Sequence, residues 1–397
     1  MKSMRYVRVS GVVLLSSALC GIVWTHLSEA KGAKGKVLGL KEVIAFTYSP
    51  SKGFDPKQLR SVTLLGPIGE KDWKYWQPRG VVTGIGQLWL GLLRTSVDKA
   101  VDVLVDRDYG GNPRPLMMID EFGFDYGGDM DEKSAQILRQ AKRRKPDLAF
   151  AVWEMRGPVP KVLADAYRDA ADLVMMESYV GDKRQYWWIA SQVWAARAYD
   201  ILRKTIVVLG VGKGGNPGED WAETPEELEQ QIRFVRAIAP KSPGVGFFGG
   251  TPELLAHADA VCARFSHLPT KDTGLPADLL AVAKTFSARH ANPTLAVSPD
   301  WVEPNYNENG SGALAQPATL RAYLMNLGDQ DALNVTIHLR NPPDKGGDVF
   351  AEGAVPVIPK RSATVAVLTV TGAWHVWIGQ WLEEVDAPGA EVQVFHR

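Results

Sequence analysis

The chain has 397 residues, of which 45% are hydrophobic and 23% charged, and its 45 basic residues balance its 45 acidic ones. This composition is typical of a folded globular protein and excludes long disordered or fibrous segments. The zero net charge argues against nucleic acid as the main partner, and two cysteines, Cys20 and Cys262, are too few for a disulfide scaffold.

The first thirty residues have the three parts of a secretory signal peptide. Basic residues precede the apolar run Gly11–Trp24, and Ser28 and Ala30 supply the small side chains that a signal peptidase reads. We expect residues 1–30 to be removed and the protein to be secreted or periplasmic, without stable membrane insertion. The alternative is an uncleaved membrane anchor, which the shortness of the apolar run disfavours. A lipid-modified Cys20 is disfavoured by the large Leu19 before it.

Short, almost continuously apolar runs follow, which is the pattern of parallel strands buried on both faces. They are Val43–Tyr48, Ser61–Gly66, Val81–Leu88, Pro115–Phe122, Leu148–Glu154, Leu173–Tyr179, Thr205–Val211 and Gly244–Gly250. Helical patterns lie between or after them, at Ser96–Arg107, Asp131–Arg144, Lys161–Ala171, Trp187–Arg203, Glu226–Ile238 and Glu253–Phe265. Thr224 and Thr251 each precede a proline, the arrangement of a capped helix start.

Strands that alternate with helices over about 250 residues predict a (β/α)8 TIM barrel, which we place at residues 38–285. Within it, Gly69–Arg79 is expected to be an inserted loop. A doubly wound open sheet is the alternative fold, but it usually has fewer strands and a glycine-rich phosphate loop after the first one.

Beyond His290 the helical period gives way to short alternating runs separated by turn residues. About seven such strands in a hundred residues are typical of an immunoglobulin-like β-sandwich. We place this all-β accessory domain at residues 292–397. The run Thr319–Asn341 resembles the adhesion-type modules of bacterial proteins.

Acids stand at the ends of three neighbouring predicted barrel strands, where this fold builds its active sites. The fourth strand ends in Asp120 and Glu121, with Asp125 beyond them; the fifth ends in Glu154 and the sixth in Glu177. Each acid directly follows an apolar run, a placement that solvated surface acids do not need. We therefore predict a cluster of functional carboxylates at the mouth of the barrel.

The alternation of side chains along a strand predicts which of these acids point into the mouth. Adjacent residues point to opposite faces, so only one of Asp120 and Glu121 points into the mouth unless a bulge intervenes, and shared parity with Asp125 favours Glu121. Glu177 and Tyr179 share parity and face the mouth together. We expect Glu121 or Asp120 and Glu177 to form the catalytic pair, with Glu154 and Tyr179 orienting the substrate.

Histidines are absent from the predicted strand ends of the barrel. The chain has His26, His257, His267, His290, His338, His375 and His396. This placement disfavours metal-dependent hydrolases, which need imidazole ligands there, and Ser-His-Asp or Cys-His systems, which need a histidine base. We predict neither a metal nor a cofactor.

The segment Gly210–Gly215 reads as G-x-G-x-x-G directly after a strand. The dinucleotide motif requires a helix to open inside it, but here Asn216–Gly218 follows and the next helix starts near Thr224. We interpret the segment as a strand-end loop that places Lys213 or Asn216 over a ligand.

Carboxylates without histidines or metal ligands are the groups that glycoside hydrolysis uses. One acid protonates the leaving oxygen, and a second carboxylate either attacks the sugar or activates a water molecule. Crowding of carboxylates raises the pKa of the acid, and aromatic faces suit sugar rings. The catalytic candidates are Asp120, Glu121, Glu177 and Glu154. The substrate-binding candidates are Tyr48, Trp89, Asp125, Trp153, Tyr179 and Lys213.

Two segments carry a family resemblance. MMIDEFGFD at Met117–Asp125 resembles the acid-bearing fourth strand of chitinase-like barrel glycosidases, and MMESY at Met175–Tyr179 resembles their sixth strand. The resemblance implies a secreted glycoside hydrolase whose partner is a carbohydrate. We expect a monomer or weak oligomer.

Two other functions stay open. A carbohydrate-binding barrel without catalysis would tolerate Glu121→Gln with little change in affinity. A lyase that uses Lys213 as a Schiff base would give a covalent adduct on borohydride trapping.

Overall fold

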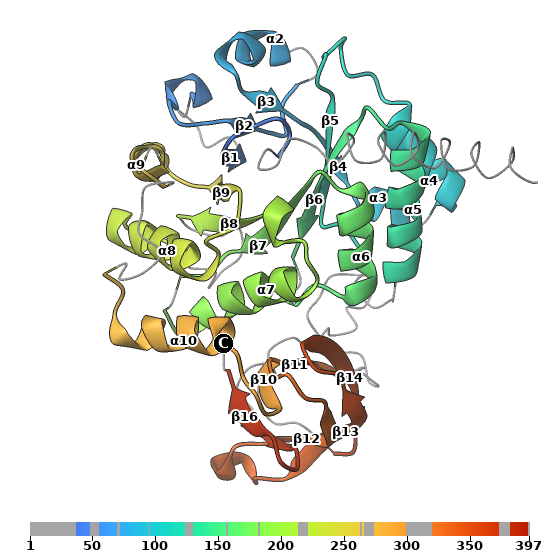
Figure 1. The fold of residues 1–397 in the computed structure, drawn as a ribbon, viewed down its shortest axis with the longest axis vertical. Coiled ribbons are helices and arrows are strands. Elements are labelled where there is room, and N and C mark those ends of the chain that lie inside the picture. The colour runs from blue at the N-terminus through green and yellow to red at the C-terminus, as the bar shows by residue number, and fades with distance from the viewer. Residues whose placement is uncertain are drawn as a thin grey trace, which may run out of the picture.

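A computed structural model describes residues 37–47, 55–69, 72–93, 95–123, 130–155, 158–181, 183–212, 221–262, 264–265, 274–298, 320–372 and 382–395. The predicted leader, residues 1–30, lies outside the described residues. Figure 1 shows helices packed around a set of parallel strands, with a separate group of strands, the C-terminal β module, below them.

The parallel strands form a closed barrel, as the sequence predicted. They are β1 (Val43–Thr47), β2 (Leu64–Leu65), β3 (Val82–Thr83), β4 (Ile85–Leu88), β5 (Leu116–Asp120), β6 (Ala149–Glu154), β7 (Leu173–Ser178), β8 (Thr205–Val211) and β9 (Gly244–Gly249). They pair in the order β3-β2-β1-β9-β8-β7-β6-β5-β4. Because β3 and β4 are consecutive pieces of one strand on either side of Gly84, the two ends of this order join. The closure excludes the open doubly wound sheet.

Gly84 is required where this strand breaks. A Cβ at Gly84 would lie 2.3 Å from the Met118 Sδ atom, so any larger residue would collide with the side chain that fills this part of the barrel.

Alternate residues of the strands face two different layers. Those of the lumen layer pack against one another inside the barrel: Val43, Ala45, Leu64, Val82, Leu116, Met118, Ala151, Trp153, Leu173, Met175, Ile206 and Val208. Their neighbours, among them Met117, Ile119 and Met176, belong to the helix-facing layer between the sheet and the surrounding helices. The layer that a strand-end residue enters is therefore set by its parity.

The helices surround the barrel. They are α2 (Trp73–Trp76), α3 (Leu90–Leu93), α4 (Val97–Val105), α5 (Asp131–Arg144), α6 (Lys161–Ala170), α7 (Tyr186–Ala198), α8 (Pro225–Ile238), α9 (Pro252–Cys262) and α10 (Ala277–Ser287). None of the helices in the described part of the chain is long and apolar enough to span a bilayer.

The helix starts and ends largely follow their sequence signals. Thr224 and Glu227 form the predicted capping box of α8. The helix predicted to run to Arg203 ends at Ala198 because Asp200 takes a left-handed conformation with φ +58°. Helix α10 has no counterpart among the helices predicted from the sequence, and the expected loop Gly69–Arg79 contains the short helix α2.

The C-terminal β module is mostly antiparallel. Its strands are β10 (Thr294–Ser298), β11 (Leu320–Asn326), β12 (Ala332–Arg340), β13 (Val349–Ile358), β14 (Ser362–Val370), β15 (Leu382–Asp386) and β16 (Glu391–Val394). They pair in the order β15-β12-β13-β14-β11-β10-β16, with only β10 and β16 parallel. The module has its own core, which includes Leu324, Ile337 and Phe350. One of the alternating runs predicted beyond His290, HVWIGQWLE from His375 to Glu383, lies mostly outside the described residues.

The β module packs directly on the helices of the barrel. The Phe395 ring stacks on Trp187 of α7 with 5.7 Å between ring centroids, and it contacts Phe286 of α10 at 5.3 Å. The Ala363 amide donates a hydrogen bond of 3.0 Å to the Tyr199 hydroxyl. These contacts join the module to the helix-facing layer, while the division at residues 285 and 292 stays a prediction.

Candidate active site at the barrel mouth

The end of β5 brings two acids to the mouth of the barrel. Leu116 and Met118 face the lumen, so strand parity assigns Asp120, the last residue of β5, to the lumen as well. The expectation that parity favours Glu121 over Asp120 is therefore wrong. Asp120 is exposed to solvent, and Glu121 is half-buried.

Glu121 breaks the alternation of the strand. Its backbone is left-handed, with φ +50°, a conformation that is costly for a residue with a Cβ. Hydrogen bonds on both sides hold it: the Trp89 amide donates to the Asp120 carbonyl at 3.1 Å, and the Phe122 amide donates to the Trp153 carbonyl at 2.8 Å. Phe122 then enters the helix-facing layer, where simple alternation would put Glu121. This departure from the pleat lets two adjacent acids share the mouth.

The end of β7 contributes Glu177 and Tyr179. Leu173 and Met175 face the lumen, so both residues follow the lumen parity, as predicted, and both are half-buried. The Tyr179 hydroxyl donates a hydrogen bond to the Glu177 carboxyl group.

Helix α7 fixes the end of this strand. The Gln192 Nε2 group donates to the Glu177 carbonyl at 2.8 Å, and the Ser178 hydroxyl donates to the Gln192 Oε1 atom. The Gln192 side chain is fully buried, so the backbone that carries Glu177 is held from the helix-facing side.

The carboxyl groups influence one another's protonation. Desolvation raises the pKa of Glu177 well above its ordinary value, and the charges of Asp120, Glu121 and Glu154 raise it further, while the Tyr179 hydrogen bond lowers it. The pKa of Glu121 is raised by desolvation and then by Asp120. Desolvation also raises the pKa of Asp120, although its side chain still touches solvent, and a hydrogen bond with the Glu121 backbone opposes the rise. Glu177 is thus the group most disposed to keep its proton.

An aromatic cluster lies beside these acids. The Tyr179 ring stacks on Phe248 of β9 with centroids 5.1 Å apart and an angle of 18°. Trp221 contacts Tyr179 at 5.0 Å and Phe248 at 5.7 Å. Trp153 meets Phe248 edge-on at 6.0 Å. Trp153 and Tyr179 were predicted from the sequence; Phe248 and Trp221 were missed, although Phe248 stands at a predicted strand end, which was the available signal.

Glu154 does not lie in the mouth. It pairs in register with Met176 of β7, which belongs to the helix-facing layer. The Glu154 side chain is fully buried and accepts a hydrogen bond of 2.7 Å from the Tyr167 hydroxyl of α6. The expectation that Glu154 orients a substrate or acts on it is therefore wrong, because the carboxylate is on the other side of the sheet. Its charge still raises the pKa of Glu177.

Trp89 does not line the mouth either. Its side chain is fully buried in the helix-facing layer, with its ring 4.6 Å from that of Phe122. Trp89 follows β4 directly, where the next residue in alternation faces outward, so the expected role in substrate binding is replaced by core packing.

Three expected binding residues, Tyr48, Asp125 and Lys213, lie outside the described residues. The described start of the segment Gly210–Gly215 continues β8 into the mouth, where the Trp221 ring lies against Gly210. Among the described residues, no group of three or more His, Cys, Asp or Glu side chains is placed to hold a metal ion.

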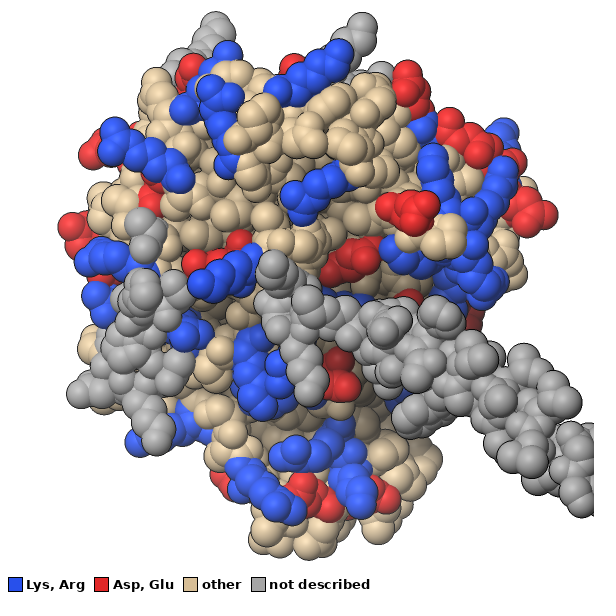
Figure 2. All heavy atoms as spheres, turned by 45° about the horizontal axis from the view of Figure 1, so that its top comes forward, with Lys and Arg blue, Asp and Glu red and all other residues tan. Residues whose placement is uncertain are grey.

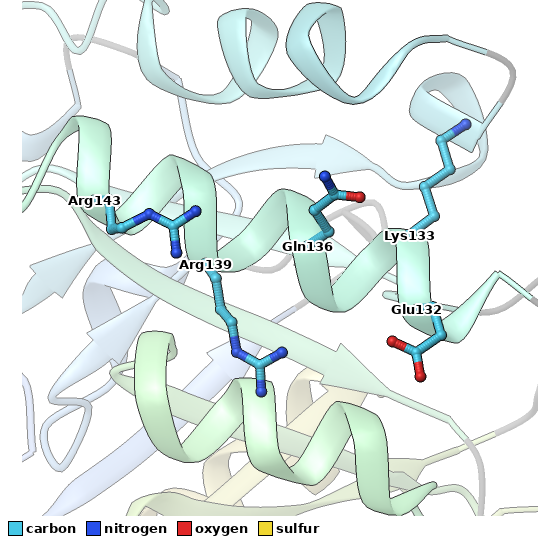
Figure 3. Close-up of a pocket in the computed structure, with 5 residues that line it drawn as sticks. All are labelled: Glu132, Lys133, Gln136, Arg139 and Arg143. Carbon is cyan, nitrogen blue, oxygen red and sulfur yellow. The ribbon is translucent and has the colours of Figure 1, made fainter.

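Two hollows lie away from the mouth. One, of about 430 Å³, is formed on α5 by Glu132, Lys133, Gln136, Arg139 and Arg143, which project from the helix in Figure 3. Arg139 is paired with Asp169 at 3.1 Å. Figure 2 shows acidic and basic side chains interspersed over the face that it presents, in keeping with the zero net charge.

The second hollow, of about 680 Å³, lies between the start of β1 and α9. Asp259 in its wall already accepts hydrogen bonds from the Ser61 amide at 2.7 Å and from the Ser61 hydroxyl at 2.6 Å. Cys262 beside it is buried, as predicted, and burial raises its thiol pKa well above the usual value. A neutral buried thiol is a poor nucleophile.

The sequence matches no protein-family model and no curated protein. Similar solved structures include a domain of a thermostable chitinase from Pyrococcus furiosus, which is 13% identical, covers 57% of this chain and 95% of that one, and has a TM-score of 0.42. A chitinase from Chromobacterium violaceum is 10% identical, with coverages of 56% and 99% and a TM-score of 0.42. An endo-β-N-acetylglucosaminidase from Cordyceps militaris is 12% identical, with coverages of 70% and 96% and a TM-score of 0.40.

Proposed function

We propose that the barrel mouth hydrolyses glycosidic bonds of a carbohydrate, with Glu177 as the proton donor and Asp120 or Glu121 as its ionised partner. The supporting observation is the meeting of three carboxyl groups from β5 and β7 at the mouth, among which Glu177 has a strongly raised pKa. A carboxyl group that keeps its proton beside carboxylates that lose theirs is the arrangement that glycoside hydrolysis needs.

The chemistry assigns one role to each strand end. Protonated Glu177 gives its proton to the glycosidic oxygen as the bond to the anomeric carbon breaks. Asp120, the more exposed of the β5 acids, or Glu121 stabilises the positive charge on the sugar, either by attacking the anomeric carbon or by taking a proton from the attacking water. Water supplies the hydroxyl group on the sugar and, in the end, the proton on the leaving oxygen.

The aromatic side chains supply the binding surface. Tyr179 and Phe248 are half-buried at the mouth, so parts of their rings face the site. The C–H faces of a sugar ring pack well on such surfaces, which would place the scissile bond near the carboxyl groups.

The test is a screen of the purified protein on plant, algal and bacterial polysaccharides, followed by Glu177→Gln, Asp120→Asn and Glu121→Gln on the substrate found. Loss of a general acid costs about 100- to 10,000-fold in rate. Glu154→Gln is the matched control, since this acid ends the neighbouring strand but faces the helices. If all three mouth variants kept activity within about tenfold, well short of the loss of a general acid, the proposed site would be wrong. A wild type that bound a glycan without cleaving it would identify a binding barrel instead.

Export by a cleaved leader is part of this proposal, since an extracellular or periplasmic enzyme would meet polysaccharides. It rests on the sequence of residues 1–30 alone. Mass spectrometry of the protein from its native host should show a chain that begins near Lys31, and an intact leader that still carries Met1 would contradict export with cleavage.

A further inference from the structure

We propose that Trp221 is a positioning residue of the mouth, whose indole holds the Tyr179 ring against Phe248 and thereby limits the access of water to Glu177. The inference rests on the proposed function, because Trp221 acts through the proton donor named there.

The backbone at Trp221 is tied to the end of β8. The Trp221 amide donates to the Gly212 carbonyl at 3.2 Å, and the Gly212 amide donates to the Ala222 carbonyl at 2.8 Å. Val211 and Ala222 also form a short parallel bridge beside these bonds. The backbone that carries the indole is therefore fixed to the barrel.

Two glycines leave the space that the Trp221 indole fills. A Cβ at Gly210 would lie 2.7 Å from the Trp221 Cδ2 atom, and one at Gly249 would lie 3.1 Å from its Cζ3 atom. Gly210 stands inside β8 and is not among the residues with positive φ, so its own backbone does not require glycine. The indole requires it, which explains the first glycine of the G-x-G-x-x-G segment without a phosphate.

The Trp221 indole is buried in the wall of the mouth, so little of its surface can contact a sugar. Trp221 is 8% exposed, whereas Tyr179 and Phe248 are half-buried. Tyr179 contacts Trp221 at 5.0 Å and Phe248 at 5.1 Å, and those two rings are themselves 5.7 Å apart. Two aromatic contacts thus restrict the Tyr179 ring, which lies on the same face of the strand as Glu177.

The charge state of Glu177 should report on this arrangement. The groups that act on it are Asp120 and Glu121 from β5, Glu154 from β6 and Tyr179 from its own strand. Removing the indole would admit water to the cluster, and water favours the ionised carboxylate. The pKa of Glu177 should then fall toward its usual range, whereas loss of the Tyr179 hydroxyl alone, which stabilises the carboxylate, should raise it.

The experiment compares Trp221→Ala, Trp221→Phe and Gly210→Ala with the wild type. The control is Gly91→Ala, a glycine whose added Cβ would have no neighbour closer than 3.9 Å. The main measurement is the pH titration of the glutamate side-chain carboxyl signals by carbon-13 NMR, with Glu177→Gln used to assign the signal of Glu177. Thermal unfolding of each variant shows that it is folded.

We expect the pKa of Glu177 to fall in Trp221→Ala and Gly210→Ala, to be restored largely in Trp221→Phe, and to be unchanged in Gly91→Ala. On an identified substrate, Trp221→Ala should lose about 100-fold in kcat, the scale of a small misplacement, and the alkaline limb of its rate profile should move to lower pH.

A folded Trp221→Ala that titrates like the wild type would overturn the inference. If Trp221→Ala does not fold, a folded Gly210→Ala with the wild-type titration overturns it in the same way. The NMR readout needs no substrate. A changed titration in a protein that cleaves no glycan would therefore support the positioning role and refute the proposed function.

Discussion

The two sides of the barrel sheet at the mouth carry the same residue types, but these residues differ in burial and in packing partners. On the lumen side, Glu177 lies half-buried among other carboxyl groups, and Trp153 packs in the aromatic cluster. On the helix-facing side, Glu154 is sealed under Tyr167, and Trp89 is fully buried beside Phe122. In the sequence all four stand at or just after the end of an apolar run. One step of parity along a strand thus separates a candidate catalytic group from a structural one.

The sharpest test of this comparison is the pair Glu177→Gln and Glu154→Gln. The first removes the proposed proton donor and should lower kcat by about 100- to 10,000-fold, equivalent to about 3–5 kcal/mol of barrier. The second leaves the lumen intact and should change kcat by less than about tenfold while lowering the free energy of unfolding. Steady-state kinetics and denaturant unfolding measure both. Equal losses of activity in the two variants would break the distinction between the sides.

Trp89→Ala tests the helix-facing side through stability. Deleting a fully buried tryptophan costs about 3–5 kcal/mol of unfolding free energy, with no change in KM if the ring only packs in the core. Trp89→Phe should cost less, because the Trp89 Nε1 group is buried without a hydrogen-bond partner among the described residues and its loss removes an unpaired donor. Phe248→Ala, on the lumen side, should instead raise KM. A changed KM in folded Trp89→Phe would contradict the core assignment.

The pH dependence of stability should report the acids on the lumen side. Glu177 has a raised pKa in the folded protein, so between the unfolded value of about 4.3 and the folded value the native state holds more protons than the unfolded one. Stability is then greatest below this window and falls as the pH rises through it. Asp120 and Glu121 act in the same direction. Glu177→Gln should flatten the fall in urea-unfolding free energy, and an unchanged pH curve in that variant would contradict the raised pKa.

Glu121→Gly should give the smallest effect and one of opposite sign. Glycine relieves a left-handed conformation that costs a side-chain-bearing residue about 1–2 kcal/mol, offset in part by the added freedom of the unfolded chain. We expect a net gain of up to about 1 kcal/mol in unfolding free energy together with a loss of activity. Glu121→Gln, which keeps the Cβ, is the control and should show no such gain. A destabilised Glu121→Gly would mean that the side-chain contacts outweigh the strain.

The sequence by itself determined the fold of the barrel and the strand ends at which the acids lie. Continuous apolar runs such as Leu173–Tyr179 need cover on both faces, and strands of this kind alternating with helices close into a barrel. Glu177 and Tyr179 could be placed because their strand keeps its regular alternation to its last residue.

Only the tertiary structure decided which acids share the mouth. The left-handed backbone of Glu121 resets the alternation of β5, and no local signal marks it, because two flanking hydrogen bonds to neighbouring strands hold it there. Glu154 and Trp89 look like mouth residues until the register of β6 against β7 and the packing of Phe122 assign their faces. Trp221 reaches the site by pairing with the end of β8. Such placements depend on contacts between segments far apart in the chain, which alternation along a single strand does not encode.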